Sequence, residues 1–145
     1  MAIIVEDGTG FADAESYISV ADASAYHAAR GNDAWAALAD DAAREQALRR
    51  ATDYMVQVYR HRWAGFRKSQ DQALDWPRYE VPRNDVPSAY GYGVLPIYYA
   101  DNIVPKEIRE ACAVLALKAA SSELAPDVDR ITRREKVDVI EVEYA

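Results

Sequence analysis

DAAREQALRRATDYMVQVYR, residues 41–60, carries the clearest periodic pattern in the chain. Its apolar residues recur at intervals of three and four, the spacing of one face of an α-helix, and most of its charged residues fall elsewhere. The apolar positions are Ala43, Ala47, Leu48, Ala51, Tyr54, Met55 and Val58. Asp40 precedes the pattern and can cap the free backbone N–H groups at its start. We therefore expect a helix from Asp41 to Arg60.

Shorter helices are predicted before this segment. SVADASAYHAARG, residues 19–31, begins with Ser19, which can cap a helix together with Asp22, and it ends with Gly31, which can terminate one. The following stretch, NDAWAALAD, predicts a short helical turn that carries Trp35.

The last helix is predicted to begin at VPKEIREA, where Pro105 suits the first helical position. The run 111–120 is apolar on every side except at Lys118. A helix that is apolar all round must be covered on more than one face. We therefore expect this helix to be central in the domain or covered by a neighbouring subunit.

Short strands are predicted at both ends of the chain. AIIV, residues 2–5, precedes the turn EDGTG, and residues 136–144 are rich in β-branched side chains. Each face of this second strand mixes apolar and acidic positions. It is therefore expected to pair at an edge, with the amino-terminal strand or with another chain.

These patterns predict a mainly α fold: a small helical bundle with a long loop rich in proline and tyrosine, about residues 61–103, and short β-strands at the two termini. At 145 residues, one domain spanning 1–145 is expected. No apolar run approaches the length of a transmembrane helix. The single cysteine, Cys112, excludes an intrachain disulfide and is expected to be an inert buried thiol, which suits a reducing cytoplasm.

Catalytic motifs are not found: the chain has no phosphate loop, dinucleotide fingerprint, G-x-S-x-G or H-E-x-x-H. His27 and His61 occupy positions typical of structural or exposed histidines. Glu107 and Glu110 alternate with basic residues, as on a solvated helix face. The sequence predicts a protein that is not an enzyme and that has no cofactor, catalytic or metal site.

The net charge of −7 is unevenly distributed. Residues 1–43 carry one basic and eight acidic side chains, whereas residues 44–83 carry nine and five. Within the basic region, YRHRWAGFRK, residues 59–68, interleaves cations with aromatic rings, a composition suited to phosphate contacts and base stacking. The alternative is a helix end with its cations near the last carbonyl groups and its aromatic rings in the core. The candidate contacts to DNA or to an acidic partner are Arg60, Arg62, Arg67 and Lys68.

Six segments, in order and across nearly the whole chain, resemble a family of small tailed-phage proteins. They are VEDGTG, ESYISVADASAYHAARG, ALRRATDYM, QALDWPR, VPKEIREACAVLAL and REKVDVIEVEY, and the combination of QALDWPR with VPKEIREA is the specific part. The family is that of head–tail connector, or adaptor, proteins, often labelled DnaT-like single-stranded DNA-binding proteins. The resemblance implies a mainly α-helical protomer that forms a dodecameric ring beneath the portal protein of the capsid.

The resemblance makes a structural virion protein of the neck the leading hypothesis, with the host cytoplasm as the place of assembly. Its implied partners are further copies of the chain, the portal protein, and a stopper or tail-completion protein. DNA would pass through the ring without sequence-specific binding. The alternative is a single-stranded DNA-binding or replication accessory protein, whose DNA binding would be lost on replacing Arg60, Arg62 or Lys68 with alanine.

A ring subunit also offers a use for QALDWPRYEVPRNDVPSAYGYGVLPIYY, residues 72–99, which contains four prolines and five tyrosines. Prolines exclude a long helix, and tyrosine is enriched at interfaces because it gives a large contact area at low entropic cost. We interpret residues 76–99 as a docking arm with Trp76 anchored inside; the alternative is a loop folded over its own core. The candidate docking residues, including those of the C-terminal strand, are Trp76, Arg78, Tyr79, Tyr90, Tyr92, Tyr98, Tyr99, Val139, Val142 and Tyr144.

Overall fold

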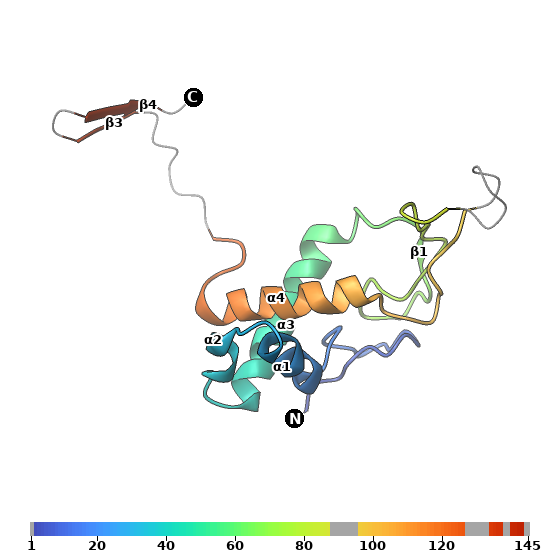
Figure 1. The fold of residues 1–145 in the computed structure, drawn as a ribbon. Coiled ribbons are helices and arrows are strands. Elements are labelled where there is room, and N and C mark those ends of the chain that lie inside the picture. The colour runs from blue at the N-terminus through green and yellow to red at the C-terminus, as the bar shows by residue number, and fades with distance from the viewer. Residues whose placement is uncertain (1, 88–95, 127–133, 138–139, 144–145) are drawn as a thin grey trace.

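Helices dominate the computed structural model, which describes residues 2–87, 96–126, 134–137 and 140–143 (Figure 1). In chain order the elements are α1 (Val20–Ala28), α2 (Asp33–Ala36), α3 (Asp41–Tyr59), β1 (Phe66–Arg67), β2 (Arg78–Tyr79), α4 (Lys106–Ser121), β3 (Arg134–Val137) and β4 (Ile140–Glu143). The predicted helix-rich class is confirmed, and each predicted helix is present. None of the helices in the described ranges combines the length and hydropathy needed to cross a membrane.

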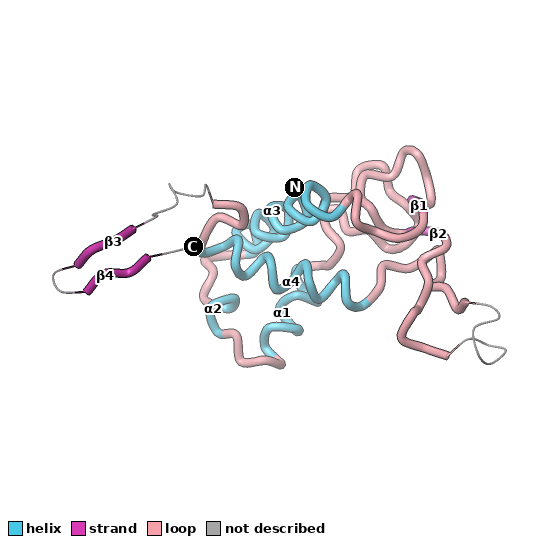
Figure 2. Tube along the Cα trace, turned by 90° about the horizontal axis from the view of Figure 1, so that it is seen from above, coloured by secondary structure: helices cyan, strands magenta, loops and turns pink. Residues whose placement is uncertain are grey.

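The core lies between α3 and α4, with α1 and α2 beside them (Figures 1 and 2). Leu48 and Ala51 of α3 are fully buried, as are Cys112, Ala113 and Ala116 of α4. The small side chains among them (Ala51, Cys112, Ala113 and Ala116) allow the two helix axes to approach closely. The alanine-rich run of the last helix therefore serves a helix–helix contact inside the protomer.

Side-chain caps set the starts of α1 and α3 as predicted. The Ser19 hydroxyl accepts from the backbone N–H of Asp22 at 3.0 Å and donates to the Asp22 carboxylate at 2.8 Å. Asp40 Oδ1 accepts from Ala43 N at 2.8 Å. Pro105 differs from its predicted place: with φ −54° and ψ 147° it is the N-cap of α4, and the helix begins one residue later.

The His27 imidazole and the Cys112 thiol, the two groups with possible chemical reactivity, have structural roles in the core. His27 is 1 % exposed, its Nε2 lies 3.0 Å from Ala113 O, and its Nδ1 lies 3.0 Å from Asn32 Nδ2. Burial lowers the pKa of His27, so the neutral ring joins α1 to α4. Cys112 is fully buried, its Sγ lies 3.4 Å from the Thr52 hydroxyl, and burial raises the pKa of the thiol. The predicted burial of Cys112 is confirmed, and of the two alternatives predicted for His27 the structure shows the structural one.

The predicted strand at residues 2–5 is wrong, because Val5 makes a single parallel bridge with Ser16 and no ladder extends from it. The cause is Glu6, whose buried carboxylate accepts three hydrogen bonds from backbone N–H groups between Gly8 and Phe11. These bonds turn the chain directly after Val5. The turn predicted at EDGTG therefore ends the extended segment before a strand can form.

The single C-terminal strand predicted for residues 136–144 is also wrong, because β3 and β4 pair as an antiparallel hairpin. The predicted edge pairing with the amino-terminal segment is thus replaced by local pairing, which has a low loop-closure cost. Val142 lies in β4. Val139 and Tyr144 fall outside the described residues.

The long loop between α3 and α4 contains more regular structure than the prediction allowed. β1 and β2 pair antiparallel, with Phe66 opposite Tyr79 and Arg67 opposite Arg78 (Figure 2). Further along, two backbone hydrogen bonds of 2.6 and 2.9 Å join residues 81–83 to residues 97–99. We call the described segments 81–87 and 96–99 the arm; they form part of the docking arm predicted for residues 76–99. The predicted docking residues Tyr90 and Tyr92 fall outside the described residues.

Candidate nucleic-acid interface

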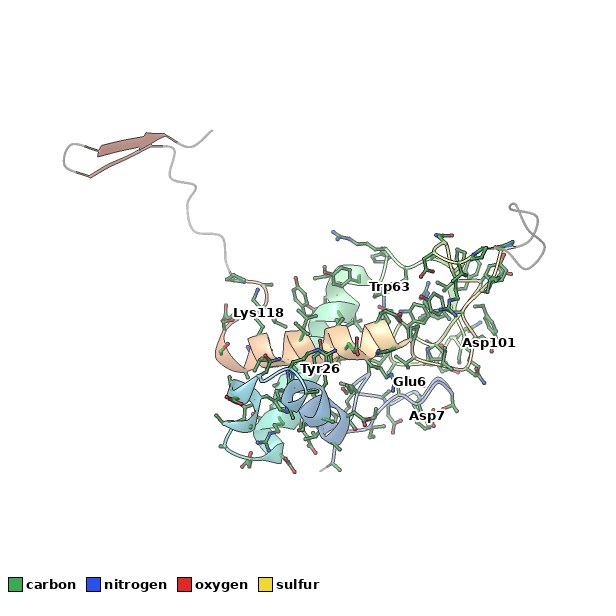
Figure 3. The ribbon with its side chains drawn as sticks, in the orientation of Figure 1. Glu6, Asp7, Tyr26, Trp63, Asp101 and Lys118 are labelled. Atoms are coloured by element: carbon green, nitrogen blue, oxygen red, sulfur yellow. The ribbon has the colours of Figure 1, made fainter. Side chains whose placement is uncertain are left out.

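A buried carboxylate, Asp75, holds the long loop to the helices. Its Oδ1 accepts from Arg60 Nε at 2.8 Å, and its Oδ2 accepts from Trp63 Nε1 at 3.2 Å. Its backbone N–H donates to the Tyr17 hydroxyl at 3.1 Å. Trp63 lies where the end of α3 meets the loop (Figure 3). Arg60, a predicted DNA contact, is therefore engaged in an intrachain ion pair.

Arg78 is the second structural cation of the loop. Its guanidinium donates to the carbonyl oxygens of Ala64 and Gly65, both at 2.8 Å, and of Asp75 at 3.1 Å. Burial lowers the pKa of Arg78, and the Asp75 carboxylate opposes this effect. Arg78 was grouped with the predicted docking residues, but at 6 % exposure it lies inside and joins the two sides of the loop.

Trp76 is buried, as expected of an anchor, and its peptide bond to Pro77 is cis. The rings of Trp63 and Tyr99 pack edge-on against it, with centroid distances of 5.9 and 6.1 Å. The guanidinium of Arg83 lies 4.8 Å from the centroid of the Tyr99 ring. Tyr99 therefore packs at the base of the arm, and the exposed Arg83 lies over it.

The remaining cations of residues 59–68 differ in availability. Arg67 Nη1 donates to Gln72 O at 3.0 Å, and Lys68 Nζ donates to Gly8 O at 3.4 Å. Arg62 is exposed, with its guanidinium 5.7 Å from the Tyr59 ring centroid, and it makes no hydrogen bond with any residue that the structure describes. Most of the cations in residues 59–68 therefore bind groups of their own chain. This agrees with the second alternative, a helix end that packs onto the protein itself.

Two aromatic side chains remain outside this packing. Phe66 is 68 % exposed and Tyr79 is 41 % exposed. They are opposite each other in the β1–β2 ladder, so they share one face, and the neighbouring Arg78 belongs to the other face. We call Phe66 and Tyr79 the aromatic platform. Tyr98 of the arm is also exposed, at 49 %.

The platform was not predicted as a unit, because its two residues come from separate segments of the loop. Tyr79 was placed among docking residues and Phe66 among the aromatics of residues 59–68. The sequence does contain one signal. FR and RY are mirror-image pairs of an aromatic residue and an arginine, so an antiparallel ladder places both aromatic residues on one face and both arginines on the other.

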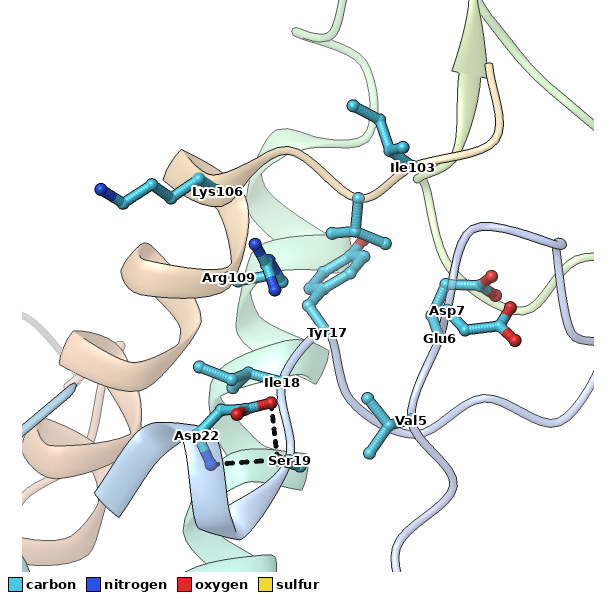
Figure 4. A pocket seen from close by; sticks show the side chains of 11 residues that line it. Val5, Glu6, Asp7, Tyr17, Ile18, Ser19, Asp22, Ile103, Lys106 and Arg109 are labelled. Carbon is cyan, nitrogen blue, oxygen red and sulfur yellow. Dashed lines mark hydrogen bonds between the residues drawn. The ribbon is translucent and has the colours of Figure 1, made fainter. Parts of the chain in front are cut away.

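A separate pocket of about 570 Å³ lies between the amino-terminal segment, the start of α1 and the start of α4 (Figure 4). Glu6 and Asp7 lie on one side of it and Arg109 on the other. Its acidic groups are occupied locally: Glu6 holds its own turn, Asp7 accepts from Thr9, and Asp22 belongs to the α1 cap. Among the described residues no cluster of three or more His, Cys, Asp and Glu has the geometry to hold a metal ion.

One protein family, described as "Putative DnaT-like ssDNA binding protein", matches residues 1–145. The chain belongs to this family. No curated protein and no solved structure matches it. The DnaT-like label that the resemblance carried is thereby confirmed, and the aromatic platform lies within the matched residues. The head–tail connector role stays a prediction for this member of the DnaT-like family.

Proposed function

We propose that this protein binds single-stranded DNA, without sequence preference, on the aromatic platform. The observation that carries the proposal is the outward exposure of Phe66 and Tyr79 on a ladder whose other residues are held by hydrogen bonds. Aromatic side chains bind single strands because each base offers a ring face for stacking, at about 1–3 kcal/mol per base. The family description is consistent with this activity.

Cations lie on the same loop as the platform. Arg62 precedes β1, and Arg83 follows β2 at the base of the arm; both are exposed. Neither guanidinium donates a hydrogen bond to a residue within the described ranges. Both are therefore available to contact phosphate oxygens beside stacked bases.

The charge distribution favours the same surface. Residues 59–87 carry six basic and four acidic side chains, whereas the rest of the chain carries eleven and twenty. A polyanion approaching the protein is therefore repelled by most of the molecule and directed to this loop.

The test is the dissociation constant for a fluorescently labelled oligothymidylate, measured by anisotropy. Replacing both platform rings, Phe66→Leu with Tyr79→Leu, should weaken binding about 30-fold or more, because two lost stacking contacts amount to at least about 2 kcal/mol. The matched control is Phe66→Tyr with Tyr79→Phe, which keeps both rings and should bind as the wild type does. Equal binding by the leucine variant would refute the proposal.

We also propose, as a second candidate, that the protein is a connector subunit of a virion neck. The observation that favours it is the arm, which leaves the body as two antiparallel segments with Pro82 opposite the exposed Tyr98. A preshaped arm with a large exposed tyrosine suits docking because little chain entropy is lost on binding. The partners would be further copies of the chain, a portal protein and a stopper or tail-completion protein.

A single variant separates the two candidates. Tyr98→Asp places a charge on the arm but leaves the platform intact. If the connector role is correct, particles should fail to join head to tail, while DNA binding by the purified protein stays unchanged. Tyr98→Phe is the control and should assemble normally. Normal particles with Tyr98→Asp would remove this role for the arm.

A further inference from the structure

The turn formed by residues 6–11 carries an exposed ring, Phe11, which is not part of the aromatic platform. Phe11 is 39 % exposed. Its backbone is held on both sides: its N–H donates to Glu6 Oε2 at 2.8 Å, and its carbonyl oxygen accepts from Ala73 N at 2.9 Å. The second of these bonds attaches the turn to the long loop. The ring is therefore displayed from a fixed backbone, so little chain entropy is lost when a ligand binds it.

The turn borders the same face of the β1–β2 ladder as the aromatic platform. The ladder pattern continues one residue beyond β1, because Lys68 N donates to Pro77 O at 3.2 Å. Side chains alternate along a strand, so Lys68 belongs to the face of Phe66, two residues earlier. The Lys68 ammonium group reaches the turn and donates to Gly8 O at 3.4 Å. The platform face of the ladder therefore leads directly to the turn that carries Phe11.

Exposed apolar side chains gather at this end of the molecule. Among the residues that the structure describes, six large hydrophobic side chains are exposed, and only Val114 of α4 lies elsewhere. A concentration of exposed apolar groups is typical of a binding surface. The five on the turn or the long loop are Phe11, Phe66, Tyr79, Tyr98 and Ile103.

We propose that single-stranded DNA bound on the aromatic platform continues past Lys68 to Phe11, whose ring stacks on a further base. This inference rests on the proposed DNA binding and extends the site from two stacked bases to three. Asp7 and Asp13, before and after Phe11 in the chain, are exposed. Carboxylates repel phosphate groups, so the contact at Phe11 is with a base ring while the backbone of the strand faces solvent.

The test is the dissociation constant of the full-length protein for oligothymidylates of about two to twelve nucleotides, measured by anisotropy. Phe11→Leu should bind the shortest oligomers as the wild type does, because the platform alone holds them. It should bind the longest about fivefold or more weakly, the least that one lost stacking contact costs. The ratio of the two constants should not change with salt, because no phosphate contact is lost.

Two control variants separate stacking from a general loss of apolar surface. Phe11→Tyr keeps an aromatic ring and should bind every length as the wild type does. Val114→Ala shortens an exposed apolar side chain of α4, far from the loop in the chain, and should also leave binding unchanged. Helical circular dichroism should be the same for all three variants, because both side chains are exposed.

Photo-cross-linking locates the further base directly. In the shortest oligothymidylate that shows the Phe11 effect, 5-iodouracil near one end should attach to Phe66 or Tyr79, and near the other end to Phe11. Mass spectrometry identifies the attached residue. If the platform variant loses binding while Phe11→Leu binds every length as the wild type does, this inference is overturned and the proposed function stands. A wild type that binds no oligothymidylate would overturn both.

Discussion

Asp75 and Arg78 show how two residues of the loop determine which others are free. The Asp75 carboxylate accepts from Arg60 and Trp63, and the Arg78 guanidinium donates to three backbone carbonyl groups. Removing Arg60 leaves the fully buried Asp75 carboxylate without its ion-pair partner. Loss of DNA binding on replacing Arg60 would therefore report damage to the loop. Arg62 and Arg83 are the informative positions.

Gly65 is the residue whose replacement should damage the platform most directly. Its φ is +65°, and a Cβ there would clash with the backbone oxygen of Tyr79. Gly65→Ala should cost about 2 kcal/mol or more in the free energy of unfolding, because left-handed strain adds to a clash between the strands. Urea denaturation measures this cost, and weaker oligothymidylate binding should accompany it.

Gly31→Ala is the matched control for Gly65→Ala. Gly31 has φ +66°, but nothing lies within 4 Å of the position of its Cβ. It should therefore show the backbone strain alone, about 1–2 kcal/mol, with unchanged DNA binding. If the two substitutions lowered the free energy of unfolding equally, the clash expected at Gly65 would not contribute to stability.

At the scale of elements, the contact between α3 and α4 depends on small side chains. Ala51 of α3 and Ala113 and Ala116 of α4 are all 0 % exposed. Cys112 reports on the same contact, because its thiol lies beside Thr52 of α3 and is buried. The long loop connects α3 and α4, so the distance between these helices determines the position of the aromatic platform.

Overpacking this contact should destabilise the protein without altering its surface. Ala51→Leu should cost about 1–3 kcal/mol, since added methyl groups in a close-packed core force neighbours apart. Ala42→Leu, on the exposed side of α3, should change stability by less than about 0.5 kcal/mol. Urea denaturation gives both values. The rate at which Cys112 reacts with a thiol reagent should rise for Ala51→Leu only, and equal rates would contradict the assigned packing.

For the whole molecule, net charge determines how the proposed DNA binding should respond to salt. The chain has a net charge of −7, and residues 59–87 are its basic part. A protein of this kind relies on stacking more than on phosphate neutralisation. Its affinity should therefore depend less on salt than that of a basic DNA-coating protein.

The salt dependence of oligothymidylate binding tests this expectation. Each neutralised phosphate of a single strand contributes a slope of about −0.7 to log K against log salt, so Arg62 and Arg83 together predict about −1.4. Replacing both with alanine should bring the slope close to zero, with the stacking contribution retained. A wild-type slope steeper than about −4 would require many more phosphate contacts than this surface provides.

The helices could be predicted from local features of the sequence. The three-and-four spacing of α3, the capping side chains Ser19 and Asp40, and the apolar run of α4 act within a few residues of where they occur. The burial of Trp76 and Cys112 was likewise expected from residue type and neighbours. The turn at EDGTG was predicted, but its consequence for the preceding segment was not.

Tertiary structure alone decided which cations and rings of the long loop are available. Arg60 and Arg62 are alike in sequence, yet one binds a buried carboxylate fifteen residues away and the other is exposed. The hairpin pairing of β3 with β4 likewise replaced the single strand that the sequence predicted. The physical reason is that helix formation depends on neighbours in sequence. Ion pairing, cross-strand pairing and burial depend on neighbours in space, which the sequence does not specify locally.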